Sequence, residues 1–488
     1  MTDVAVWKGD CAAYPLEPPF HPPAQYPEMR LRGIDISNMA YDAVRQLFHL
    51  LNYDDAEFGT QEWNPLGWLV KPGQTVLLKP NLVRQETMDD CGDWQHVITH
   101  GSVVRAVIDY VYIALGGHGR IQVADAPQGD SKMELIRRRF GIDAIRQTYR
   151  DQLQFEIEFI DLRDEEWDDY KGVMTNRRRL PGDPLGTVKF DLGADSCFSE
   201  VDYLKRRYYG AFYNDSETNS HHSEGRHEYV LAKSPLAADV LISIPKLKTH
   251  KKVGVTLNLK GVVGLTADKN CLPHYAFGSP DTNGDQFPEK TRIEGAIIGF
   301  AKRCLADGNP AAIFAGKTMK SIMYHLFGDG KRTIRAGNWW GNDTCWRMTL
   351  DLNRILLYGN ANGSWRKAPK PYLSVVDGII AMEGDGPMAG TPRPCGVVIG
   401  GQNPAAVDAA ATSLMGFNCT SVPMILRSFD NHRFQIGNGD WRAVRVTSNV
   451  DEFNGCAGEL STPMPFRAHW AWREAIERAG AVFAADRR

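Results

Sequence analysis

The feature that most constrains the fold is an alternation of short apolar runs with stretches of helical periodicity. Residues 75–78, 121–124 and 155–160 have the length and composition of buried strands. Between them, residues 103–115 and 131–149 have helical spacing, and two glycines close the first of these segments. Strands that alternate with helices at this spacing predict an α/β fold with a doubly wound, mostly parallel sheet.

Segments of the same two kinds extend this pattern towards both ends of the chain. Apolar runs of strand length recur at residues 4–7, 240–244, 372–376 and 397–399. Helical spacing recurs at residues 36–51, where Ser37 or Asn38 offers a cap, and at residues 404–415, which begin with proline. A surface helix is expected at residues 466–485. The sheet is therefore expected to collect strands from the whole length of the chain.

Two segments interrupt the pattern. Residues 161–233 are polar and aromatic and indicate an insertion with short strands, such as one at 188–191. Residues 291–365 contain helical spacing at 291–305, 311–326 and 344–358 and predict a helical cap. The α/β core is then assigned to three parts, which are residues 1–160, the lysine-rich segment 234–290, and residues 366–488 with the C-terminal helix.

Composition and charge limit the classes of function. The chain has 488 residues and a net charge of -3, so it lacks the overall positive charge that is typical of proteins that bind nucleic acid by electrostatic attraction. No charge-free stretch is long enough to span a bilayer, and the N-terminus lacks the pattern of a secretory signal. Nine cysteines without a CxxC pair predict a reduced cytoplasmic protein with no iron–sulfur cluster motif. We therefore expect no nucleic-acid partner and no membrane partner.

A lysine-rich stretch follows the apolar run at 240–244. Pro245 breaks that run, and no acidic residue occurs between Asp239 and Asp268. The basic side chains that follow are Lys246, Lys248, His250, Lys251, Lys252 and Lys260. A lysine cluster at the exit of a buried strand is suited to hold phosphate or carboxylate, although a solvated basic loop is the commoner structure for such clusters. Lys251 and Lys252 are expected at the surface, whereas Lys246 and Lys248 are expected to face the same way.

Polar residues also follow other expected strands. Lys79 and Asn81 follow the first strand of the alternating region, Asp125 follows the second, and Asp377 follows the run at 372–376. His100 opens the helix at 103–115. Ligands of doubly wound sheets bind where the strands end, so these residues and the lysine cluster are expected to form one cleft.

Acidic residues and glycines are combined at residues 377–390. Glycines in this stretch allow a close approach of the backbone to a ligand, and the spacing is not that of a dinucleotide fingerprint. Glu383 and Asp385 are oxygen ligands of the kind that Mg²⁺ prefers. The candidate metal ligands are therefore Asp125, Glu383 and Asp385, and the alternative is a glycine loop with solvated acids.

The histidines and Lys260 are expected to differ in their roles. Positive neighbours are expected to lower the pKa of His250 and to keep it neutral, as a base requires. Lys260 lies in the mostly apolar stretch TLNLKGVVGL, so its amine must find a partner, extend to solvent or reach a cleft. His221, His222 and His227 lack regular zinc-ligand spacing and are expected in a polar surface loop.

Several motifs in order resemble a known family. The stretches VLLKPNLV, VADAP, ADVLISIPKLKTH, LNLKGVVG, VVDGIIAMEGDGP and GGQNPAAVD, with the helix expected after Thr99 and His100, together resemble the domain-of-unknown-function family 362, with two interruptions between residues 4 and 415. The resemblance implies a cytoplasmic α/β protein of bacterial or archaeal type. Some relatives are described as iron–sulfur proteins, but this chain lacks their clustered cysteines. The residues that match the motifs are Lys79, Asn81, His100, Asp125, Lys246, Lys248, His250, Lys260, Asp377, Glu383, Asn403 and Asp408.

The first functional hypothesis is an enzyme that acts on an anionic small metabolite bearing phosphate or carboxylate. The expected ligand-binding residues are Lys79, Asn81, His100, Lys246 and Asn403. The expected catalytic residues are His250, Lys248, Lys260 and Asp377, with a divalent cation such as Mg²⁺ as the candidate cofactor. Group transfer, isomerisation and elimination fit such a site better than oxidoreduction.

Two alternatives belong to other classes of function. One is an oxidoreductase component that receives electrons from a partner iron–sulfur protein or a bound cofactor. The other is a non-catalytic protein that binds a nucleotide or an acidic glycan. Its stacking surface would be formed by Tyr203, Tyr208, Tyr209, Phe212 and Tyr213.

Overall fold

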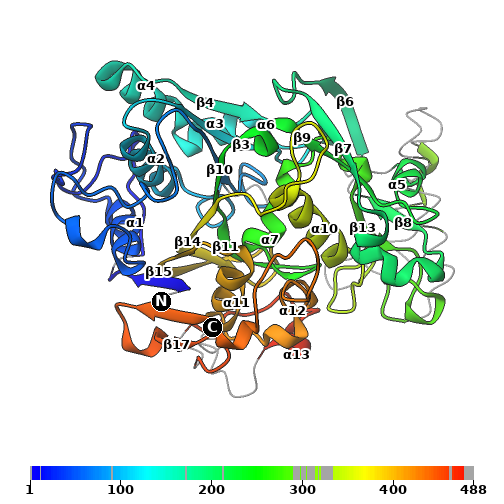
Figure 1. Cartoon of the computed structure of the whole chain (residues 1–488). Helices are drawn as coiled ribbons and strands as arrows, with labels where there is room; N and C mark the ends of the chain where they lie inside the picture. Colours follow the sequence, from blue (N-terminus) through cyan, green and yellow to red (C-terminus); the bar gives the residue numbers. More distant parts are fainter. Residues whose placement is uncertain are drawn as a thin grey trace.

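The computed structural model describes residues 3–10, 12–88, 92–170, 173–210, 214–289, 334–460 and 464–477, with residues 297, 304, 314–316 and 318–319. An 11-stranded mixed sheet forms its centre (Figure 1). The strands of this sheet are β1 Val4–Lys8, β2 Thr75–Pro80, β3 Arg120–Asp125, β4 Ile157–Asp161, β10 Val240–Ile244, β11 Lys246–His250, β12 Gly254–Val255, β14 Tyr372–Glu383, β15 Thr391–Gly401, β16 Arg445–Ser448 and β17 Gly455–Cys456.

The strands follow the order β17-β16-β1-β15-β14-β10-β2-β3-β4, and β11 pairs with β14 and β12. From β14 through β10, β2 and β3 to β4, every neighbouring pair is parallel. Antiparallel pairs join β1 to β15 and β15 to β14. The prediction of a mostly parallel sheet that collects strands from both ends of the chain is confirmed.

Helices cover both faces of the sheet. The helices are α1 Met39–Leu50, α2 Gly101–Leu115, α3 Met133–Phe140, α4 Ile142–Leu153, α5 Asp215–His221, α6 Lys233–Ala237, α7 Leu257–Gly261, α10 Cys345–Tyr358, α11 Pro404–Leu414, α12 Pro423–Arg427 and α13 Arg473–Ile476. Figure 1 shows α1 and α2 apart from α7, α10 and α11, with the sheet between them.

Alternate side chains of the central strands enter two separate hydrophobic cores. Val76 and Leu78 of β2 pack with the residues of α1 and α2, whereas Leu77 packs with those of α7, α10 and α11. This alternation follows from the pleat, which turns successive side chains to opposite faces. The sheet is therefore doubly wound, as the sequence predicts.

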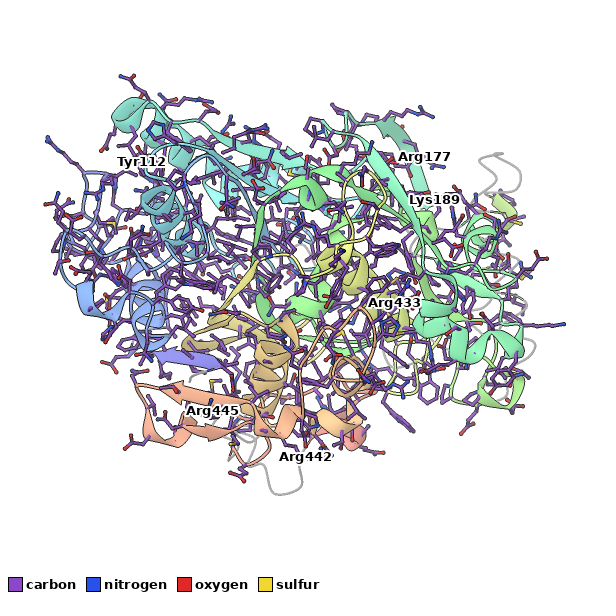
Figure 2. All side chains as sticks on the ribbon, viewed as in Figure 1. Tyr112, Arg177, Lys189, Arg433, Arg442 and Arg445 are labelled. Atoms are coloured by element: carbon purple, nitrogen blue, oxygen red, sulfur yellow. The ribbon has the colours of Figure 1, made fainter. Side chains whose placement is uncertain are left out.

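The segment expected as an insertion forms three small pairs of strands. Strand β5 Glu165–Tyr170 pairs with β6 Val173–Arg179, and β7 Thr187–Asp191 pairs with β9 Glu228–Ala232. Strand β8 Tyr208–Gly210 pairs with β13 Pro273–Ala276, which lies outside the insertion and after Lys260 in the sequence. Figure 2 shows Arg177 of β6 and Lys189 of β7 at the outer surface of this segment. The strand expected at residues 188–191 is confirmed by β7.

Some expected elements differ from the structure. The single helix expected at residues 131–149 is two helices, because Gly141 adopts a φ of 69° and ends α3 before α4 begins. The loop expected from Asp377 onwards is mostly strand, since β14 continues to Glu383 and pairs with β15. Of the helix expected at residues 466–485, only α13 is helical among the described residues.

The helix expected at residues 344–358 is confirmed by α10, and every one of its side chains is buried. The helices expected at 291–305 and 311–326 lie mostly outside the described residues. Within the part of the chain that the structure describes, no helix combines the length and the apolar character needed to cross a bilayer.

Candidate functional site

A basic cavity of about 450 Å³, called the lysine cavity below, lies beside the carboxyl ends of β2, β3 and β11. Its lysines are Lys79, Lys248, Lys251, Lys252, Lys260 and Lys269. Among the residues that the structure describes, two carboxylates line it, and both are ion-paired, Asp125 with Lys79 and Asp130 with Arg84. The structure brings six of the expected site residues to this cavity, which are Lys79, Asn81, Asp125, Lys248, His250 and Lys260.

The pair formed by Lys79 and Asp125 builds one wall of the lysine cavity. Lys79 Nζ lies 2.8 Å from Asp125 Oδ1, and both side chains are buried. Asp125 also accepts hydrogen bonds from the backbone N–H of Leu82 and of Ala126, at 2.6 and 2.8 Å. Gly264 packs directly on this pair, since a Cβ there would overlap Asp125 Oδ1 and lie 2.9 Å from Lys79 Nζ. The Asp125 carboxylate is thus occupied by its ion pair with Lys79 and by hydrogen bonds from the two backbone N–H groups.

Lys248 lies fully buried beside Lys79. Its Nζ donates to Asn81 Oδ1 at 3.1 Å and to the carbonyl oxygen of Val97 at 2.8 Å. Burial holds the pKa of Lys248 well below its usual range, and the neighbouring charges of Lys246 and Lys260 act in the same direction. These two acceptors hold the Lys248 amine in place at the cavity.

Lys260 projects from α7, the short helix next to the cavity. Its side chain is 9% exposed, and among the described residues no hydrogen bond or ion pair is formed by its amine. Burial lowers the pKa of Lys260, and the charge of Lys79 lowers it further. Asp408 of α11 fixes α7 by accepting from the N–H groups of Asn258 and Leu259 at 3.0 and 2.8 Å. An amine with no acceptor among the described residues therefore lines the cavity on a rigid support.

His250 is neutral, as the sequence predicts. Burial lowers its pKa well below the usual range, and the charges of Lys260, Lys251 and Lys252 add to the effect. Its Nδ1 accepts the backbone N–H of Lys252 at 3.0 Å, so the neutral ring carries its proton on Nε2. In this tautomer His250 presents a hydrogen-bond donor to the cavity, and its basic nitrogen is already engaged.

His274 is a cavity residue that sequence reasoning missed. Its Nδ1 donates to the carbonyl oxygen of Leu272 at 2.8 Å, so Nε2 is the unprotonated nitrogen. Burial lowers the pKa of His274 to about 3, with contributions from Lys260 and Lys252. No local pattern marks this residue, which lies on β13, a strand that pairs with β8 of the expected insertion.

Three lysines at the cavity also differ from expectation or were missed. Lys251 and Lys252 were expected at the surface, but both are half-buried and line the cavity. Lys252 Nζ donates to the carbonyl oxygen of Ala336 and lies 4.9 Å from the centroid of the Tyr275 ring. Lys269 was missed, and its amine donates to the carbonyl oxygens of Ala126 and Pro127.

Lys246 and Asp377 form a second, fully buried cluster with Tyr14 and His100. Asp377 accepts from the Tyr14 hydroxyl at 2.5 Å, from Lys246 Nζ at 2.9 Å and from the backbone N–H of His100 at 2.9 Å. The rings of Tyr14 and His100 stack at 4.0 Å. Neither Lys246 nor Asp377 lines the lysine cavity.

Lys246 and Lys248 were expected to face the same way, and the structure separates them. The pairing of β11 with β14 shifts register between these two lysines, from Lys246 opposite Asp377 to Lys248 opposite Met382. Such an irregularity redirects side chains along a strand. Lys246 therefore reaches the buried carboxylate of Asp377, whereas Lys248 reaches the cavity.

Asn403, Glu383 and Asp385 also lie outside the lining of the lysine cavity. Asn403 caps α11 by accepting the N–H of Ala406 at 2.9 Å, and it borders a second cavity of about 420 Å³. Glu383 is ion-paired with Arg393 and Arg467, at 3.1 and 2.8 Å. Asp385 is exposed.

The three carboxylates expected to hold a metal do not form a joint site. Asp125 is engaged by Lys79, and Glu383 by two arginines. A different group, Glu217, His221 and Asp268, places one possible ligand atom from each residue within 4.8 Å of the others. His221 also contacts Glu228 at 3.1 Å.

The expectation of a polar surface loop is wrong for two of the histidines. His222 and His227 are buried, and their Nδ1 atoms lie 3.4 Å apart. The stacking surface suggested for the insertion is also not formed by Tyr208 and Tyr209, which are 3% and 2% exposed. Phe212 and Tyr213 lie outside the described residues.

Comparison with known proteins agrees with the sequence motifs. A thylakoid-associated protein of Synechocystis sp. is 24% identical over 358 residues, which cover 73% of this chain and 68% of that protein. Residues 198–413 match a family model described as "Domain of unknown function (DUF362)", and the match contains Lys248, His250 and Lys260. The family matched by residues 198–413 is thus the same family that the sequence motifs resemble.

Proposed function

We propose that the protein is an enzyme that binds an anionic small metabolite, bearing phosphate or carboxylate, in the lysine cavity. The observation that carries this proposal is the charge balance of the cavity, where six lysines face two carboxylates that are already ion-paired. Keeping several amines in a buried space is costly unless a counter-charge joins them. A bound phosphate or carboxylate supplies that charge and accepts hydrogen bonds from the amines.

The polar groups of the cavity favour transferase, isomerase or lyase chemistry. His250 offers an Nε2–H donor, His274 offers an acceptor nitrogen, and Lys260 offers an amine without a partner. Together they can stabilise developing charge and move a proton. We propose no metal-dependent step, because two of the three expected metal ligands, Asp125 and Glu383, are already ion-paired with basic residues. Free thiols at all seven described cysteines support the cytoplasmic location proposed from the sequence.

Replacing Lys260 by methionine is expected to stabilise the free protein and to weaken anion binding. The free energy of unfolding should rise by about 1–2 kcal/mol, because the change replaces a mostly buried lysine, whose charged form is disfavoured by burial, by an apolar side chain of similar length. Affinity for sulfate should fall by about tenfold or more, because one charged donor is lost. Urea denaturation measures the first effect, and thermal shift against sulfate concentration measures the second.

The matched control is Lys367→Met, which removes an exposed lysine away from the cavity. This control should leave both the unfolding free energy and the sulfate response within experimental error. A Lys260→Met protein that is less stable than the parent, with an unchanged sulfate response, would refute the assignment of Lys260 to an anion site.

Affinity for sulfate is also expected to fall as the pH rises from 7 to 9. Burial lowers the pKa of Lys269 to about 8 and lowers the pKa of Lys248 and Lys260. Sulfate stays dianionic over this range, so only the protein loses charge. Because the amines bind sulfate as ammonium groups, binding takes up protons, and affinity falls about tenfold per pH unit for each linked proton.

Calorimetric titrations in buffers of different ionisation enthalpy measure this proton uptake directly. Lys269→Met should reduce the number of protons taken up at pH 8, whereas Lys367→Met should not change it. Sulfate affinity that is constant between pH 7 and 9, without proton uptake, would contradict the proposed role of these lysines.

A further inference from the structure

The amine of Lys260 differs from the other amines of the lysine cavity. Lys79 is paired with Asp125, and Lys248 has two hydrogen-bond acceptors. Lys252 and Lys269 donate to backbone carbonyl oxygens, and Lys251 is attracted by the carboxylate of Asp385. Lys260 is more than nine-tenths buried, lines the cavity and has no partner among the described residues. Burial lowers the pKa of Lys260, which increases the share of the uncharged amine, and the uncharged amine keeps a free lone pair and is a nucleophile.

Two histidines with opposite tautomers accompany this amine. The charge of Lys260 contributes to the lowered pKa of both His250 and His274, so both rings lie within its electrostatic reach. Backbone hydrogen bonds at Nδ1 fix the tautomers, because His250 accepts from Lys252 and His274 donates to Leu272. One ring therefore offers an N–H donor, and the other offers an acceptor nitrogen.

We propose that Lys260 forms a Schiff base with the carbonyl carbon of an anionic carbonyl compound, in which a carboxylate or phosphate accompanies an aldehyde or ketone. This inference rests on the proposed function, because the neighbouring lysines must hold the anionic group of the same ligand. It narrows the substrate class from any anionic metabolite to one with a carbonyl group. Lys260 is then the catalytic nucleophile of the site.

The step balances without any oxidant or reductant. The lone pair of Lys260 Nζ attacks the carbonyl carbon, and the electrons of the C=O π bond move to the oxygen, which accepts a hydrogen bond from His250 Nε2–H. The two amine protons pass in turn to His274 Nε2 and from there to that oxygen. The C–O bond breaks, one water leaves, and a C=N bond remains between Lys260 and the substrate.

Reductive trapping tests this step. The full chain is incubated at pH 7 with pyruvate, as a 2-oxo acid, or with glyceraldehyde 3-phosphate, as a phosphorylated aldehyde, and is then treated with borohydride. We expect one reduced adduct in the intact mass, placed on Lys260 by peptide mapping. Lys260→Arg keeps a cation but cannot form the adduct, so it should show no label at this position, whereas Lys367→Met should label fully.

Thermal shift with lactate, which carries the carboxylate but no carbonyl group, and with phosphate separates the two proposals. Stabilisation by these anions without an adduct on Lys260 would overturn the Schiff base and leave the anion site standing. Absence of both stabilisation and adduct would overturn the proposed function itself. An adduct on another cavity lysine would overturn the assignment to Lys260.

The proton-transfer role of His274 is tested by the rate of adduct formation. His274→Gln removes the acceptor nitrogen, so it should slow the rate of adduct formation by about a hundredfold, while stabilisation by phosphate persists. Unchanged trapping rates in His274→Gln would overturn the role given to this ring.

Discussion

Replacing Asp377 by alanine is expected to lower the free energy of unfolding by about 3–5 kcal/mol. Asp377 is fully buried and accepts from Lys246 Nζ, the Tyr14 hydroxyl and the backbone N–H of His100. Without the carboxylate, the Lys246 amine is left in the protein interior with no counter-ion, and Tyr14 loses one of its two hydrogen bonds to β14. Urea denaturation followed by circular dichroism measures the change.

Two further variants show whether this loss comes from an unpaired buried charge. Asp385→Ala removes an exposed carboxylate from the turn after β14 and should change stability by less than about 0.5 kcal/mol. The double variant Lys246→Met, Asp377→Leu removes both charges and should recover much of the loss, because a buried ion pair can be replaced by apolar residues at little cost. A loss below about 1 kcal/mol in Asp377→Ala would contradict this account.

The position of Asp377 in the structure differs from the position that the sequence pattern predicts. Asp377 was expected to be catalytic because it follows an apolar run that resembles a complete strand. In the structure the strand continues past Asp377 to Glu383, so the carboxylate lies within the sheet. Apolar runs locate strands well, but polar residues buried inside a strand are mistaken for its end. A different cause led to the prediction that Lys246 and Lys248 face the same way, since a shift in register between paired strands has no local sequence signal.

Most of the site that could be predicted from the sequence depends on parallel strands. Lys79 and Asp125 follow buried apolar runs, and parallel strands bring their carboxyl ends to one edge of the sheet. Lys248 and His250 follow the same logic, because β10 is parallel to β2. These residues meet in the lysine cavity as expected.

The rest of the cavity comes from contacts distant in sequence. His274 arrives on β13, whose partner β8 lies in the segment expected as an insertion. Lys269 reaches the carbonyl oxygens of Ala126 and Pro127 across a separation of 143 and 142 residues. Neither His274 nor Lys269 belongs to a hydrophobic periodicity or to a motif, so the sequence alone could not predict that they lie near the strand ends.

Gly264→Ala is expected to remove anion binding and to lower the free energy of unfolding by about 3–5 kcal/mol. A Cβ at this position would overlap Asp125 Oδ1 and lie 2.9 Å from Lys79 Nζ. The carboxylate cannot move aside freely, since the N–H groups of Leu82 and Ala126 also hold it. The methyl group must therefore separate a buried ion pair or displace the turn that carries Gly264. Urea denaturation and the thermal response to sulfate measure the two effects.

Gly261 supplies a matched control three residues earlier. A Cβ at Gly261 would meet nothing within 4 Å, and this residue lies at the end of α7. Gly261→Ala should therefore leave stability unchanged or raise it by up to about 1 kcal/mol, because alanine is the better helix former. Both substitutions add the same methyl group to the same short segment, so a general effect of alanine on its backbone would appear in both. If the two variants lose stability equally, the ion pair between Lys79 and Asp125 does not fill the space beside Gly264. If Gly264→Ala loses both stability and the sulfate response, and Gly261→Ala loses neither, the anion binds beside the ion pair of Lys79 and Asp125.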